Sequence, residues 1–237
     1  MNIIKYSFLT VLIFLVSCTN TKEDVGGSVT LLVSTNVRGQ LDPCGWKKNP
    51  LGGLSRKSTY VKQLNNEGKN VVILDAGDLL FNNSSLVDVQ READILRAKA
   101  VIKGYETIGC DVVNVGGFDL AAGLEYLQQV IDSTNIPFIS ANIIDSRTNQ
   151  KLFPPHHIIE NDGISIGIIG LTNLIPSHTD KVKVEDFITV GKAQIDELRN
   201  KVDIVVVLAN VNRDKNEEMN EEFSDCLLYT SPSPRDR

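Results

Sequence analysis

The residue best placed for chemistry in this sequence is Asp78, which closes the apolar run 71–78, VVILDAGD. Such a run is typical of a buried strand, and its last residue would lie at the carboxyl edge of a sheet, where open α/β sheets bind ligands. A catalytic metal pair needs several carboxylates and imidazoles that converge from strand ends. The polar residues that follow the apolar runs include few of these: Asn36, Arg38, Asp78, Asn82, Asn83, Asp119, Asn142, Asn210 and Arg213.

The three histidines do not supply the imidazole ligands that a metal pair would need. His156 and His157 are adjacent on or beside an expected strand, so their side chains should point to opposite faces. His178 lies outside the strand-end loops. We interpret all three as edge or surface residues rather than metal ligands.

The elements that would position these residues alternate along the chain. Loop 36–53 is rich in glycine and proline, which excludes regular structure there. The turn Asn161-Asp-Gly163 between two apolar runs predicts an antiparallel hairpin. The alternation predicts an α/β fold, a layered sandwich with mainly parallel β-sheets flanked by helices and an inserted β-hairpin. The expected strands are 29–35, 70–75, 111–115, 137–140, 152–159, 164–169 and 202–208, and the expected helices are 54–66, 88–107, 120–133 and 190–201.

The order of segments resembles the N-terminal domain of bacterial 5′-nucleotidases, within the calcineurin-like metallophosphoesterase superfamily. The resemblance covers about Val29 to Asn216, and only the combination of its pieces is specific. The loop 38–45, together with 50–56, is similar to a branch of lipoprotein relatives. The matching pieces are Ser34-Thr-Asn36, Leu74-Asp-Ala-Gly-Asp78, Gly116-Gly-Phe-Asp119, Gly123-Leu-Glu-Tyr-Leu127, Ser140-Ala-Asn-Ile143 and Ile168-Ile-Gly-Leu-Thr172.

The resemblance implies a phosphoester hydrolase with a divalent metal pair (Mn, Zn, Fe or Mg). Asp78 corresponds to the aspartate that bridges the two ions. The first motif of the family has a ligand Asp and a ligand His where this chain has Asn36 and Arg38. A later Gly-His-any-His motif falls beyond the matching segment. The places of a metal-binding Asn, the catalytic His and a further ligand His hold Gly117, Phe118 and Asn210.

These replacements change the chemistry of the site. Asn36 is neutral and Arg38 adds a positive charge, whose repulsion of a metal ion at contact range costs several kcal/mol at low effective dielectric. Phe118 cannot transfer a proton. We therefore predict that the binuclear mechanism does not operate and that the domain is a binding or scaffold module. The alternative is an active, metal-dependent, 5′-nucleotidase-like hydrolase with an altered metal site.

Two alternatives also remain for the arginine at the site. Arg38 can bind a phosphate through two parallel hydrogen bonds, with Arg56 as a second anion-binding residue, or it can form a salt bridge with Asp78. The ligand would be a nucleotide or another phosphorylated molecule. If metal binds at all, the candidate ligands are Asp78, Asn36 and Asn210.

The N-terminal residues predict attachment to a membrane. Residues 1–17 have the pattern of a signal peptide, with an apolar segment too short to span a bilayer. Leu15-Val-Ser-Cys18 is similar to the lipobox of bacterial lipoproteins, which implies lipidation of Cys18 and a tether over residues 18–27. The alternative is an ordinary cysteine in an anchor segment. The expected location is the bacterial cell envelope, outside the cytoplasm on the periplasmic or surface side.

The C-terminal residues 225–237 are similar to a translated sequencing adapter, so we set them apart from the fold. The domain is then expected over residues 28–224 and to be truncated at its C-terminal end. Within it, Cys44 and Cys110 could pair, but their separation in sequence does not predict proximity. The net charge of −6 and the lack of a Lys/Arg cluster argue against nucleic acid as a partner.

Overall fold

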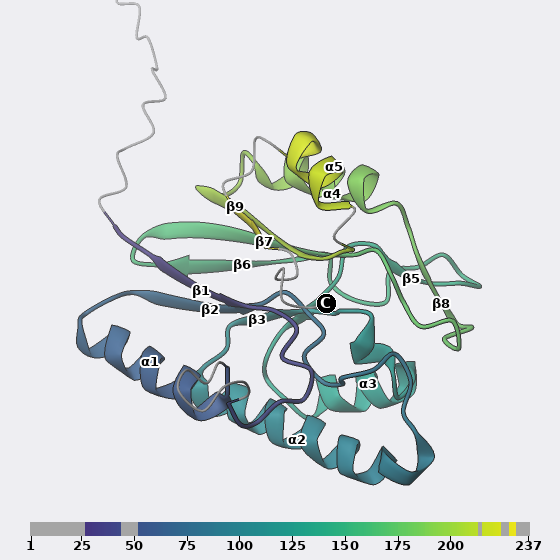
Figure 1. The fold of residues 1–237 in the computed structure, drawn as a ribbon. Coiled ribbons are helices and arrows are strands. Elements are labelled where there is room, and N and C mark those ends of the chain that lie inside the picture. The colour runs from purple at the N-terminus through teal and green to yellow at the C-terminus, as the bar shows by residue number, and fades with distance from the viewer. Residues whose placement is uncertain (1–26, 44–51, 213–214, 224–227, 231–237) are drawn as a thin grey trace, which may run out of the picture.

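The computed structural model describes residues 27–43, 52–212, 215–223 and 228–230. Its elements form four layers: three helices, a parallel sheet, a second sheet, and two further helices (Figure 1). The two sheets pack face to face, and each carries helices on its outer face. This is the α/β sandwich that the alternation of the sequence predicts.

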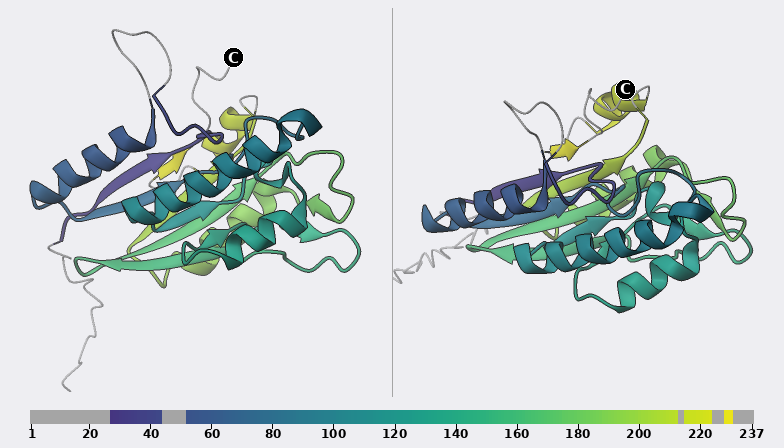
Figure 2. Two further views of the ribbon diagram at one scale, coloured as in Figure 1. Left: turned by 90° about the horizontal axis from the view of Figure 1, so that it is seen from below. Right: turned by 60° about the horizontal axis from the view of Figure 1, so that its bottom comes forward.

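The first sheet has the order β1-β2-β3-β4, and all its pairings are parallel. Three helices cover its outer face and appear blue to teal on that side in both views of Figure 2. The strands are β1 (Thr30–Ser34), β2 (Val71–Asp75), β3 (Val112–Asn114) and β4 (Phe138–Ile139), and the helices are α1 (Leu54–Asn66), α2 (Arg91–Ile108) and α3 (Leu124–Asp132).

The second sheet has the order β10-β9-β7-β6, in which only the β6–β7 pairing is antiparallel. Helices α4 and α5 pack on its outer face. A separate two-stranded sheet joins β5 and β8. The bounds are β5 (Ile143–Asp145), β6 (His156–Asn161), β7 (Ile164–Thr172), β8 (Val182–Val184), α4 (Phe187–Leu198), β9 (Ile204–Asn210), α5 (Asn216–Glu222) and β10 (Leu228–Thr230).

The apolar run before Asp78 is buried on both faces because β2 lies inside the first sheet. Val72 and Leu74 pack against the second sheet, whereas Ile73 packs against the helices. Asn114 links the sheets, since its side-chain amide donates to the carbonyl oxygens of Ala76 and Leu171, each at 3.0 Å. Alternate side chains of one strand therefore belong to different layers.

The expected hairpin is confirmed. Asn161 pairs with Ile164, and the turn residues Asp162 and Gly163 have φ values of 52° and 76°. Positive φ at both central residues is the requirement of a type I′ turn.

Several expected boundaries are wrong. Strand 152–159 begins only at His156, because Pro154 and Pro155 have no N–H to donate to a ladder. Helix 120–133 begins at Leu124, after Gly123 with a φ of 94°. Helix 190–201 covers Phe187–Leu198 instead, and the side chain of Asp186 caps its first turn.

Four elements were not expected: β5, β8, α5 and β10. β10 lies in the segment that the sequence analysis sets apart, and its short pairing with β9 does not test the origin of that segment. Within the described ranges, no helix is long and apolar enough to cross a membrane.

Candidate functional site

The loops after β1 and β2 run side by side and bring the first site residues together. The backbone N–H of Asn36 donates to the carbonyl oxygen of Gly77 at 3.0 Å, and that of Arg38 donates to the carbonyl oxygen of Asp78 at 2.8 Å. Asn36, Arg38 and Asp78 all have left-handed backbones, with φ values of 53°, 53° and 55°. Residues other than glycine seldom adopt this conformation, so the paired loops impose it.

Asp78 is buried where these two loops meet, with 6% of its surface exposed. Its Oδ1 accepts the backbone N–H of Phe118 at 2.8 Å. Burial raises the pKa of Asp78, although the Phe118 N–H, the side chain of Asn210 and the charge of Arg38 all act to lower it. The carboxylate is therefore held by hydrogen bonds from two different strand ends.

Asn210, the last residue of β9, joins the same group. Its side-chain oxygen accepts the N–H of Gly117 at 3.3 Å. The structure thus brings together the five predicted positions at strand ends: Asn36, Asp78, Gly117, Phe118 and Asn210.

Arg38 does not form the expected salt bridge with Asp78, since no ion pair within 4.0 Å joins them among the described residues. Its guanidinium lies over the ring of Phe118 instead, 5.1 Å from the ring centre. The reason is that the Asp78 carboxylate faces the Phe118 N–H and Asn210. Arg38 still acts on Asp78 through its charge.

The described residues do not fit a metal pair. Asp78 is the only carboxylate among the predicted ligands, and the described chain contains no group of three His, Cys, Asp or Glu side chains able to hold an ion. Gly117 stands where the family is expected to have a metal-binding Asn, but a Cβ there would collide with the carbonyl oxygen of Leu174. An Asn side chain at this position would require the backbone to move.

Asp119 has a structural function that the sequence does not predict, since it joins two loops through hydrogen bonds. It is completely buried and accepts three backbone N–H groups, from Leu80 at 2.8 Å, Gly116 at 2.8 Å and Asp78 at 3.1 Å. Burial, together with the neighbouring charge of Asp78, raises the pKa of Asp119 to about 8. Its position at a strand end was visible, but its function as a clamp between two loops was not.

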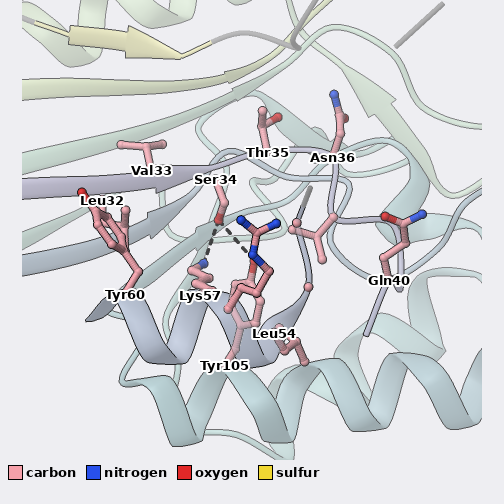
Figure 3. A pocket seen from close by; sticks show the side chains of 14 residues that line it. Leu32, Val33, Ser34, Thr35, Asn36, Gln40, Leu54, Lys57, Tyr60 and Tyr105 are labelled. Atoms are coloured by element: carbon pink, nitrogen blue, oxygen red, sulfur yellow. Dashed lines mark hydrogen bonds between the residues drawn. The ribbon is translucent and has the colours of Figure 1, made fainter. Parts of the chain in front are cut away.

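Arg56, the second expected anion-binding residue, lies elsewhere. It lines a cavity between β1 and α1, and the described lining of that cavity does not include Arg38 (Figure 3). The described lining of this cavity therefore contains only one of the two arginines.

The remaining candidates do not join the site. His156 and His157 lie on β6, at the edge of the second sheet, and His156 hydrogen-bonds Gln194 at 2.8 Å. Cys110 is buried, and burial raises the pKa of its thiol to about 12. Three predicted residues lie outside the described ranges, namely Cys18, Cys44 and Arg213.

Comparison with known proteins agrees with this geometry. No protein-family model matches the sequence. The chain is 31% identical over 182 residues to a 2′,3′-cyclic-nucleotide 2′-phosphodiesterase/3′-nucleotidase of Salmonella typhimurium, a match that covers 67% of this chain and 27% of the relative. It is 29% identical over 178 residues to a 5′-nucleotidase of Vibrio cholerae, covering 70% of this chain and 31% of that protein. The chain thus spans about a third of their length or less.

Solved structures give the same fold. The 5′-nucleotidase precursor from Thermus thermophilus superposes with a TM-score of 0.66 at 22% identity, over 80% of this chain and 38% of that one. The sequence matches show that the chain is a homologue of these nucleotidases over the matched residues, and the solved structures show that it has the metallophosphoesterase fold.

Proposed function

We propose that this chain is a lipid-anchored envelope protein whose strand-end site binds a phosphorylated ligand, with a nucleotide as the first candidate, without hydrolysing it. The observation that carries the proposal is the Arg38–Phe118 contact. It places a fixed cation over an aromatic ring at two positions where the resemblance implies a metal ligand and a proton donor.

The guanidinium of Arg38 is well suited to such a ligand. No ion pair with Asp78 uses it within the described chain, and its Nε atom is buried without a hydrogen-bond partner there. A guanidinium can donate two parallel hydrogen bonds to a phosphate.

The ligand class is inferred from the relatives. The names of the two matching proteins refer to nucleotides or cyclic nucleotides as their substrates. The same names support the alternative function, a metal-dependent hydrolase that works with an altered site. The donor set of the described residues disfavours this alternative, since it has one carboxylate and no imidazole.

Binding can be separated from hydrolysis by calorimetry with AMP in the presence of EDTA. We expect AMP to bind without metal, and Arg38→Met to weaken binding about tenfold or more, because a charge-assisted hydrogen bond is worth roughly 1.5–3 kcal/mol. Arg91→Met is the matched control, since Arg91 is exposed at the start of α2. Equal affinities in wild type and Arg38→Met would exclude this site.

A hydrolysis assay tests the alternative directly. The chain is incubated with Mn²⁺, Zn²⁺ or Mg²⁺ and with AMP or a chromogenic phosphodiester. We expect no turnover above that of the metal alone. Metal-dependent turnover that disappears in Asp78→Ala would show that the chain is an enzyme and would overturn the proposal.

The lipid anchor is a separate part of the proposal and rests on the lipobox-like residues before Cys18. Expression from residue 1 in a bacterium, followed by fractionation, tests it. We expect the wild type in the membrane fraction and Cys18→Ser to lose the mass of the lipid. Identical masses and fractions for both proteins would refute lipidation at this residue.

A further inference from the structure

We propose that the cavity between β1 and α1 is a second ligand site, which takes a small organic monoanion with a planar, apolar body. It does not depend on the function proposed for the strand-end loops. The cavity has a volume of about 500 Å³, within the usual range for small-molecule sites.

The walls of the cavity are mainly apolar. Leu32 from β1, Leu54 and Tyr60 from α1, and Tyr105 from α2 contribute to them (Figure 3). Tyr60 keeps 49% of its surface exposed, so a ligand could cover it at little cost. The exposed ring of Tyr60 and the aliphatic side chains favour a flat apolar molecule, whose burial supplies most of the affinity.

Polar groups converge on one side of this cavity. The ammonium of Lys57 donates to Ser34 Oγ at 2.8 Å, and Ser34 Oγ donates to Asp75 Oδ2 at 2.6 Å. Tyr105 donates to the same carboxylate oxygen at 2.6 Å, and the Lys57 ammonium lies 4.0 Å from the centre of the Tyr105 ring. The network fixes the position of the Lys57 ammonium at the cavity wall.

Lys57 is the group that would recognise the acid. An ammonium has three N–H donors, and among the described residues Ser34 is the only hydrogen-bond partner of the Lys57 ammonium. The remaining donors can bind a carboxylate or sulfonate that enters the cavity. Arg56 lines the same cavity and adds a second positive charge.

The buried carboxylate of Asp75 favours a ligand with a single negative charge over a dianion. It is completely buried behind Ser34 and partly cancels the charge of Lys57. A dianion such as a phosphate monoester would meet this carboxylate at short range, whereas a monoanion needs only the remaining donors of Lys57. The cavity therefore differs in charge preference from the Arg38 site.

Asn36 belongs to the strand-end site and also lines the cavity, but the polar groups around Lys57 lie on the other side of β1. Figure 3 shows Ser34 directed toward Lys57 and Tyr105, whereas Thr35 and Asn36 point away from them. This follows from the alternation of side chains at the end of β1. A ligand in the cavity would thus contact α1 and α2 rather than Phe118 and Asn210.

The test uses two probes of the same shape, 2-naphthoate and its neutral counterpart 2-naphthamide, titrated into the ¹⁵N-labelled protein and followed by NMR. We expect 2-naphthoate to shift the amide signals of Ser34, Lys57 and Tyr60, and to bind at least fivefold more tightly than 2-naphthamide. Equal affinities, or shifts confined to other residues, would overturn the proposal. This comparison needs no variant and so does not depend on the folding of one.

Variants then assign the contacts. Lys57→Met should abolish the preference for the acid over the amide, and Tyr60→Ala should weaken both probes about equally. Lys62→Met, at an exposed position of the same helix, is the matched control and should leave both affinities unchanged. If Lys57→Met keeps the fivefold preference for 2-naphthoate over 2-naphthamide, Lys57 is not the group that binds the carboxylate of the ligand. Inorganic phosphate, added as a competitor, should not displace 2-naphthoate; displacement would contradict the argument from Asp75.

Discussion

Replacing Asp119 by Asn should make the stability of the chain less dependent on pH. Asp119 is completely buried and its pKa in the fold is about 8, whereas an unfolded chain has an Asp pKa of about 3.9. Between these values the folded chain keeps a proton that the unfolded chain has released. The contribution of Asp119 to stability is therefore largest at low pH and is lost as the pH rises through this window.

The size of this pH dependence follows from the difference between the pKa of Asp119 in the folded chain and its pKa in the unfolded chain. One pKa unit corresponds to about 1.4 kcal/mol, so the wild type should lose roughly 3–4 kcal/mol of unfolding free energy between pH 5 and pH 8 through this residue alone. Asn does not titrate. At pH 5 the variant should be less stable than wild type by about 1–3 kcal/mol, because its amide cannot accept one of the three backbone N–H groups.

Urea unfolding followed by circular dichroism at pH 5 and pH 8 measures both differences. We expect the deficit of Asp119→Asn at pH 5 to disappear or reverse at pH 8. The other carboxyls are common to both proteins, so their titration cancels to first order. Asp132→Asn, at an exposed position of α3, is the control and should show no such change. An equal deficit at both pH values would refute the reasoning, because it would mean that three N–H donors keep Asp119 ionised in the fold.

Three further substitutions test the packing around the sites by urea unfolding. Tyr105→Phe removes the hydrogen bond to Asp75 but keeps the ring, and should cost about 1.5–3 kcal/mol; a loss below about 0.5 kcal/mol would show that the hydroxyl does not stabilise the carboxylate. Asn114→Ala removes two hydrogen bonds, of which the one to Leu171 links the two sheets, and should cost about 2–4 kcal/mol; an unchanged midpoint would contradict that linking function. Gly170→Ala should cost about 1–3 kcal/mol or more, since its Cβ would lie 2.8 Å from the carbonyl oxygen of Ile139; tolerance of Ala would show that the sheets separate easily.

The convergence of the strand-end residues could be predicted because it depends on topology alone. Parallel strands deliver the residues that follow them to one edge, so Asn36, Asp78 and Asn210 meet whatever their side chains do. The hairpin after β6 was predictable for a similar reason, since the turn Asp162-Gly163 has a local conformational requirement.

The partners of individual side chains could not be predicted in this way. A salt bridge and an anion-binding site are both compatible with Arg38 in the sequence, and the direction of the Asp78 carboxylate, which the sequence does not give, speaks only against the salt bridge. Lys57 is an ordinary helix residue until Ser34 and Tyr105, which come from two other elements, are placed beside it. Such networks depend on contacts between distant residues that no local pattern encodes.

Hydrogen bonds between the two loops around Asp78 hold the shape of these loops. Left-handed backbones at three non-glycine residues cost of order 1–3 kcal/mol each unless the surroundings impose them. Here backbone hydrogen bonds between the two loops, and the three N–H groups that Asp119 accepts, impose them without any metal. Backbone atoms and a buried carboxyl hold these loops together. Asn36 and Arg38 can therefore take the places of the expected ligands, and Phe118 that of the expected proton donor, without collapse of the loops. The positions at the rim can therefore vary without loss of the loops, and under the function proposed above Arg38 would favour an anionic ligand.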